Sequence, residues 1–138
     1  MTRISLALLL GVALTIASCA GAAETIPADV DLAVTMKDYR VELSVDTVKA
    51  GTVKIGIKNA GGMEHSFELI KSDLPFDKLP VDSGAAKAKE DGLVKQVKSL
   101  GVGKVSVVTA DLAAGNYVII CNVAGHYQLG MRAALKVQ

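Results

Sequence analysis

Apolar and polar residues alternate in several short runs of this chain, and this period of two constrains the fold more than any other feature. Alternation of this kind is typical of β-strands with one buried face. Turn-forming sequences such as KAGT at 49–52 and NAGGME at 59–64 separate the runs. The positions that define the runs are Val30, Leu32, Val34 and Met36, then Val41, Leu43 and Val45, then Val53, Ile55 and Ile57, and then His65, Phe67 and Leu69.

Three further strands are expected in the C-terminal part of the chain, at 105–109, 117–121 and 131–137. About seven to eight short strands with turns between them predict an all-β fold, a Greek-key β-sandwich. The sequence LAAGNY at 112–117 also indicates a tyrosine corner, in which the Tyr117 hydroxyl bonds to the backbone before the penultimate strand.

Residues 72–104 interrupt the strand pattern, because they contain two of the three prolines and an Ala/Lys-rich stretch. The stretch from Ala85 to Leu100 favours one or two short helices, with Gly92 as a cap or a break. The sequence therefore predicts a short helical or irregular insert that crosses the end of the sheets.

The first residues have the layout of a secretory signal peptide, with Arg3, an apolar run at 4–16 and small residues near a cleavage site. The run is too short for a permanent membrane span. IASC at 16–19 resembles the lipobox of bacterial lipoproteins, in which Cys19 is acylated and becomes the mature N-terminus. AGA at 20–22 instead fits a plain cleavage site that releases a soluble protein.

We therefore expect three parts: a signal peptide at 1–18, a short tether at 19–27 and one domain at 28–138. The domain is expected outside the cytoplasm, in the periplasm or at the cell surface, and on the membrane only if Cys19 is acylated. Without Arg3, the 14 remaining Lys and Arg residues balance 14 Asp and Glu residues. A nucleic-acid partner is therefore not expected, and the domain is expected to be monomeric.

Cys121, His126 and Met131 lie at five-residue steps in the sequence CNVAGHYQLGM. Expected strands stand on both sides, so residues 122–130 form a loop at the end of the sandwich, where side chains can turn towards one point. The Cys121 thiol has no partner once Cys19 lies in the leader or carries a lipid. An odd cysteine outside the cytoplasm indicates that something else occupies the thiol.

A thiolate, two imidazoles and a long, weak thioether are the donor set of a blue-copper site. The chain has two histidines, and the second, His65, follows the NAGGME turn at the start of a strand, where it can meet the 122–130 loop. Taken singly, His126 also fits a surface imidazole and His65 a hydrogen-bonded core histidine. Taken with Cys121, the two histidines favour a metal site.

The fourth donor has alternatives. Met131 also fits a core residue at the start of the last strand, Met63 precedes His65 by two residues, and Gln128 is a chemically possible axial donor. Three neighbouring polar residues could brace the site through hydrogen bonds to the sulfur or the loop, although ordinary turn and strand roles explain them as well; they are Asn59, Glu64 and Ser66.

GGMEHSFEL at 61–69, followed by GNYVIICNVAGHYQLGM at 115–131, resembles the small cupredoxins, the plastocyanin, azurin and rusticyanin group of type 1 copper proteins. The resemblance covers about residues 27–138, and its loop spacing is most similar to the rusticyanin and sulfocyanin type. It implies a cupredoxin-type sandwich with one copper per chain. The ligands that it implies are His65, Cys121 and His126 in the equatorial plane and Met131 on the axis. The insert and the scarcity of aromatic residues depart from the family pattern and leave the docking mode open.

The predicted function is one-electron transfer between a redox donor and acceptor that dock near His126. An enzyme is not expected, because two histidines provide neither an open copper position nor a second metal cluster, and no other catalytic set is visible. A periplasmic copper chaperone or buffer is the main alternative. A sandwich that serves adhesion without any metal is the second.

Overall fold

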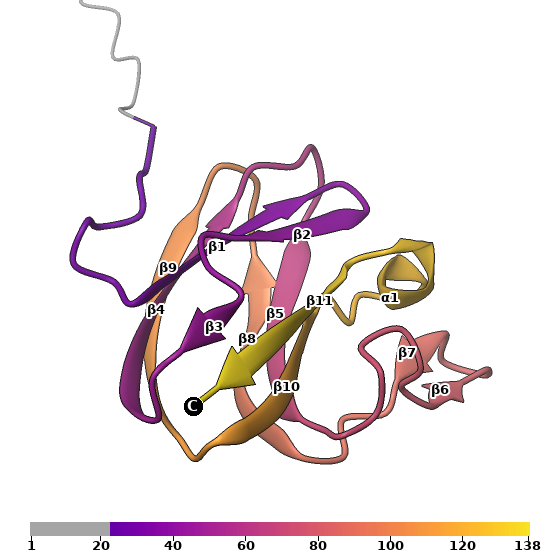
Figure 1. Cartoon of the computed structure of the whole chain (residues 1–138). Helices are drawn as coiled ribbons and strands as arrows, with labels where there is room; N and C mark the ends of the chain where they lie inside the picture. The colour runs from indigo at the N-terminus through magenta and orange to yellow at the C-terminus, as the bar shows by residue number, and fades with distance from the viewer. Residues whose placement is uncertain (1–22) are drawn as a thin grey trace, which may run out of the picture.

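Two β-sheets pack face to face in the computed structural model, which describes residues 23–138 (Figure 1). The expected signal peptide and the candidate lipidation residue Cys19 lie outside these residues. The four-stranded sheet has the spatial order β2 (Arg40–Leu43), β1 (Leu32–Lys37), β4 (Gly51–Asn59) and β9 (Val105–Leu112). The five-stranded sheet has the order β3 (Thr47–Val48), β11 (Arg132–Val137), β10 (Gly115–Ile120), β5 (His65–Lys71) and β8 (Leu93–Leu100). The predicted all-β sandwich is confirmed.

The pairing of β1 with β4 is parallel, and its register places Met36 beside Asn59. Because parallel strands end at the same edge of a sheet, the turn after β1 and the loop after β4 lie side by side. The backbone N–H of Ala60 donates to the Met36 carbonyl at 2.8 Å, which fixes this juxtaposition.

The inward face of each sheet carries the alternating apolar residues that the sequence indicates. Val34 and Ile55 from one sheet and Leu69 and Ile119 from the other share one buried cluster. The cluster also contains Tyr117, whose hydroxyl donates to the Ala113 carbonyl at 2.8 Å, so the predicted tyrosine corner is confirmed.

The prediction of helices between Ala85 and Leu100 is wrong. This region forms β7 (Lys87–Ala88), which pairs with β6 (Val81–Asp82), and then the long strand β8. Strand β8 adds to the edge of β5, where backbone groups would otherwise lack partners, and this tertiary pairing overrides the weak helix preference of Ala and Lys. Gly92, at φ 85°, makes the turn into β8.

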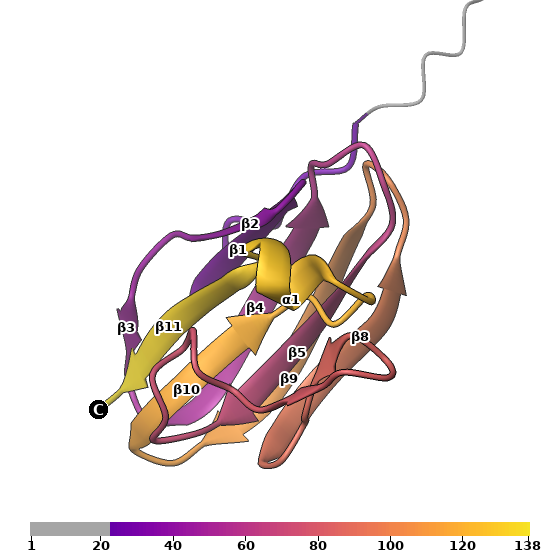
Figure 2. The ribbon, with the colours of Figure 1, turned by 90° about the vertical axis from the view of Figure 1, so that its right-hand side faces the viewer.

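The segment between β5 and β8 covers the outer face of the five-stranded sheet instead of crossing its end (Figure 2). It contributes Leu79 and Ala88 to a second apolar cluster, which also contains residues that point outward from β5 and β10. Strand β5 is therefore buried on both faces over its first six residues.

The helix of the structure lies in the loop after β10 rather than in the insert. This single turn, α1 (His126–Leu129), stands between Gly125 at φ 83° and Gly130 at φ 119°, a left-handed conformation that glycine adopts without strain. Among residues 23–138, no helix is long and apolar enough to cross a membrane.

Candidate metal centre

Three sequence-predicted ligands converge at one end of the five-stranded sheet. His65 begins β5, Cys121 follows β10 directly, and His126 begins α1. Strands β5 and β10 are adjacent and antiparallel, so the end of β10 lies against the start of β5. The Cys121 Sγ lies 3.7 Å from Nδ1 of His65 and 3.4 Å from Nδ1 of His126.

These spacings fit donors of a single ion. The ligand atoms of the three residues lie within 4.8 Å of one another, and all three residues are buried. Sulfur and nitrogen donors bound at roughly 2.0–2.3 Å to a tetrahedral ion lie about 3.5 Å apart, close to the observed distances. In the part of the chain that the structure describes, this is the only such group of three His, Cys, Asp or Glu side chains.

Met131 is fully buried and lies in the same apolar cluster as Cys121. The Cys121 N–H donates to the Met131 carbonyl at 3.0 Å, and the Met131 N–H donates to the His126 carbonyl at 3.0 Å. These two bonds close the loop from Cys121 to Met131. Of the alternative fourth donors, Gln128 is exposed and Met63 is partly exposed, on the loop before β5.

The electrostatics of the buried groups suit a bound cation. Burial raises the pKa of the Cys121 thiol, against an opposing hydrogen bond from the Ser66 N–H at 3.3 Å, so a thiolate here needs a positive charge beside it. Burial, together with the neighbouring His65, lowers the pKa of His126 and favours the neutral imidazole that a metal requires. Soft sulfur with two imidazoles is a donor set for copper.

Of the three candidate bracing residues, Ser66 contacts the sulfur, whereas Asn59 and Glu64 hold the loop before β5. The Ser66 N–H reaches the sulfur, and the Ser66 Oγ lies 3.7 Å from it. The Asn59 side-chain amide donates to the carbonyls of Met63 and Leu100 at 2.8 Å each, which holds the loop before β5. Glu64 is exposed and accepts from the Ser99 hydroxyl at 2.6 Å, so it ties this loop to β8.

Two carboxylates beside the site were not predicted from the sequence. Asp38, in the turn after β1, places Oδ1 3.1 Å from Nε2 of His65. Glu68 is buried on β5, and its Oε2 accepts from the Ser66 hydroxyl at 3.1 Å and from the Asn122 N–H at 3.0 Å. The glycines of the NAGGME turn indicate that another group packs closely against this turn. The sequence does not show that this group is Asp38, because its position depends on the pairing of β1 with β4.

Glu68 borders a cavity of about 560 Å³, which Ser66 and Asn122 also line. Burial raises the pKa of Glu68 to about 7, and the nearby Glu90 adds to this effect. The Asn122 side chain fixes the cavity wall, because it donates to the Ala88 carbonyl at 2.9 Å and accepts from the Ala88 N–H at 2.8 Å.

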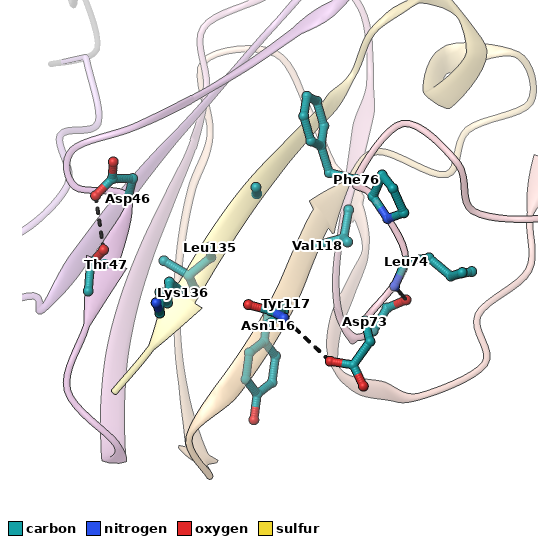
Figure 3. Close-up of a pocket in the computed structure, with 13 residues that line it drawn as sticks. Asp46, Thr47, Asp73, Leu74, Phe76, Asn116, Tyr117, Val118, Leu135 and Lys136 are labelled. Atoms are coloured by element: carbon teal, nitrogen blue, oxygen red, sulfur yellow. Dashed lines mark hydrogen bonds between the residues drawn. The ribbon is translucent and has the colours of Figure 1, made fainter.

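A second cavity, of about 480 Å³, lies away from the metal-binding residues, between β3, β10, β11 and the 72–76 segment (Figure 3). Asn116 donates to Asp73 across it at 3.4 Å. Leu74 and Phe76 form its exposed apolar rim. None of the four predicted ligands lines this cavity.

The sandwich and its buried thiolate and imidazole donors define a small mononuclear metalloprotein with a type 1 copper site. Residues 28–138 match the family described as copper binding proteins, plastocyanin/azurin family. The chain belongs to this family, and the copper cofactor expected from the sequence is confirmed.

Solved structures agree in fold. Dithionite-reduced auracyanin from the photosynthetic bacterium Roseiflexus castenholzii matches with a TM-score of 0.56 and 20% identity over 77% of this chain and 94% of that chain. Rusticyanin from Thiobacillus ferrooxidans matches with a TM-score of 0.59 and 21% identity over 77% of this chain and 76% of the rusticyanin chain. No curated protein matches the chain in a sequence comparison.

Proposed function

We propose that this chain is a one-electron carrier rather than an enzyme, with His65, Cys121, His126 and Met131 as the ligands of its copper. When bound, copper would supply a Cu(II)/Cu(I) couple, which would allow one electron to pass from a reduced partner to an oxidised one. The observation that carries the proposal is the burial of the donor set: His65 and Cys121 are 0% exposed and His126 is 8% exposed. Closely packed side chains hold one geometry, which keeps rearrangement between oxidation states small.

The His126 ring provides the path to the surface. It is the most exposed of the three converging ligands, and its ring lies 5.8 Å, edge to face, from that of Tyr39. Leu129 in the same loop is 60% exposed, and Tyr39 is 44% exposed. We infer that this apolar surface docks the redox partners, because exposed apolar side chains that gather at one place mark contact surfaces.

The first experiment is anaerobic copper titration of the purified protein, followed by visible spectroscopy and voltammetry. An intense blue thiolate-to-Cu(II) band with a reversible one-electron couple is the expected result. Cys121→Ser removes the band, whereas Cys19→Ser retains it. A blue band that persists in His65→Ala contradicts the assignment of His65.

The fourth ligand is tested separately. Met131→Leu is expected to keep the blue band and change the reduction potential, because the axial donor influences the potential more than it influences the thiolate bond. Gln128→Ala is the matched control, since its side chain is exposed. Equal potentials in Met131→Leu and the wild-type protein contradict the axial role.

The docking surface is tested by electron self-exchange between oxidised and reduced copies of the protein. Leu129→Ser is expected to slow self-exchange several-fold without changing the spectrum. Leu74→Ser is the control, because Leu74 is also exposed, at 48%, but lies in the second cavity. Equal slowing by both variants contradicts docking at the His126 end.

A copper chaperone or buffer is the alternative function. Such a protein must release copper to an acceptor, and burial of the donors behind the loop from Cys121 to Met131 opposes rapid release. Tight Cu(I) binding without the blue band, and transfer of copper to a competing chelator within seconds, favours this alternative over the carrier.

We also propose that the protein is exported and anchored through an acylated Cys19, with soluble release after AGA at 20–22 as the other route. Mass spectrometry of the membrane and soluble fractions tests this. A diacylated or triacylated N-terminal Cys19 in the membrane fraction supports the anchor. An unmodified N-terminus beyond Cys19 in the soluble fraction contradicts it.

A further inference from the structure

The turn between β1 and β2 brings a carboxylate to the face of His65 that points away from the sulfur. Lys37 pairs with Arg40, so the turn consists of Asp38 and Tyr39. The parallel pairing of β1 with β4 places this turn beside the loop that leads into His65. The Asp38 Oδ1 lies 3.1 Å from Nε2 of His65, while Nδ1 of the same ring faces the Cys121 Sγ at 3.7 Å.

The loop after β4 is built to receive this carboxylate. The Gly62 N–H donates to both Asp38 oxygens, at 3.1 and 2.9 Å. At Gly61, a β-carbon would lie 2.3 Å from the Asp38 Oδ1 and 2.7 Å from Nε2 of His65. Any side chain at position 61 would therefore separate the carboxylate from the imidazole, and the contact depends on glycine there.

This contact has two chemical effects on His65. A metal on Nδ1 requires the ring proton on Nε2, and a carboxylate that accepts this proton's hydrogen bond selects that tautomer and fixes the ring orientation. The carboxylate also brings a full negative charge, which a backbone carbonyl in the same place would not bring. That charge increases ligand basicity and stabilises the more positive of two metal oxidation states.

The Asp38 side chain is 39% exposed, and the His65 side chain is 0% exposed. The charge therefore acts through a buried ring but stands at the solvent boundary, where salt screens it. The size of its effect should decrease as ionic strength increases.

We propose that Asp38 is a positioning residue of the copper couple, which holds His65 with Nδ1 free for the metal and lowers the reduction potential of the site. This inference rests on the proposed one-electron role. Asp38 lies in the turn between β1 and β2, which contains none of the proposed ligands. The proposal also explains the two glycines of NAGGME, because Gly61 leaves space for the Asp38 carboxylate and Gly62 donates to it.

The test uses the copper-loaded full chain with two substitutions at one position. Asp38→Asn removes the charge but leaves an oxygen that can accept from His65 and Gly62. The expected result is a higher midpoint potential at low salt, a smaller difference from wild type at high salt, and an unchanged visible spectrum. Glu42→Gln is the matched control. It removes a negative charge from the same hairpin, but the Glu42 carboxylate pairs with Lys37 rather than with an imidazole.

Asp38→Ala removes both the charge and the acceptor. In the copper-free protein, nitrogen NMR is expected to show His65 shifting from the Nε2–H tautomer towards Nδ1–H in this variant, while Asp38→Asn retains Nε2–H. If Asp38→Ala does not fold, the midpoint potential of Asp38→Asn, compared with that of wild type, decides the proposal alone.

Equal potentials in Asp38→Asn, Glu42→Gln and wild type overturn the electrostatic role of Asp38. An unchanged His65 tautomer in a folded Asp38→Ala variant overturns the positioning role. A wild-type protein without a reversible couple refutes the proposed carrier function instead, and the tautomer measurement on copper-free protein still tests the contact.

Discussion

Substitution of the buried acid Glu68 by glutamine should stabilise the fold at neutral and alkaline pH but not at acidic pH. Burial raises the pKa of Glu68 from 4.5 to about 7 in the folded state. Between these two values, the folded protein holds a proton that the unfolded chain has released. The free energy of unfolding therefore falls as pH rises through this window, and the loss is complete above the folded-state pKa.

The magnitude follows from the separation of the two pKa values. At 1.36 kcal/mol per pKa unit, ionised Glu68 costs about 3 kcal/mol of stability above pH 7. Glu68→Gln removes the ionisation and keeps an oxygen that can accept from the Asn122 N–H. The variant should match wild type near pH 4.5 and exceed its stability by about 3 kcal/mol near pH 8.

Urea denaturation, followed by far-UV circular dichroism across this pH range, measures the difference. The protein should be copper-free, because copper binding has its own pH dependence. Glu64→Gln is the control for the loss of an acidic side chain from this cavity, since Glu64 lines the same cavity but is exposed. If Glu68→Gln and wild type change stability in parallel from acidic to alkaline pH, the argument from burial is refuted.

Three further outcomes are expected. Tyr127→Phe should lower the free energy of unfolding by about 1–3 kcal/mol in urea, because the Leu79 N–H loses the hydroxyl acceptor at 2.9 Å that it has inside the protein. Gly61→Ala should weaken copper binding and alter the visible spectrum, because its β-carbon would meet Nε2 of His65; Gly101→Ala, whose β-carbon would make only an ordinary contact at 3.6 Å, should do neither. Removal of copper by a chelator should lower the Tm of the wild-type protein in calorimetry, whereas Cys121→Ser should show the same Tm with and without the chelator.

The sandwich and the convergence of three donors were predictable because both follow from strand periodicity. Alternation places His65 at the start of one strand, and NYVII places Cys121 at the end of another. Two such positions meet when the strands are antiparallel neighbours. His126 lies near both residues because its loop starts at Cys121, at the end of β10, and must return to the adjacent strand β11.

Strand β8 and the two carboxylates were not predictable, since each depends on contacts distant in sequence. The composition before Leu100 favours a helix, and only the free edge of β5 turns it into a strand. In HSFELIK, Glu68 occupies a position that alternation assigns to solvent, but the segment between β5 and β8 covers that face. Asp38 reaches His65 only through the parallel pairing of β1 and β4.

The place of β11 determines when this protein can fold during its synthesis. Strand β11 is inserted between β10 and the much earlier β3, with Lys136 beside Thr47 and Ile120 beside Arg132. A nascent chain that lacks β11 has an open seam in the five-stranded sheet and no anchor for the loop that carries His126. Because such long-range pairings form slowly, we expect the sandwich to close, and the site to capture copper, only after β11 has been synthesised and has paired with β10 and β3.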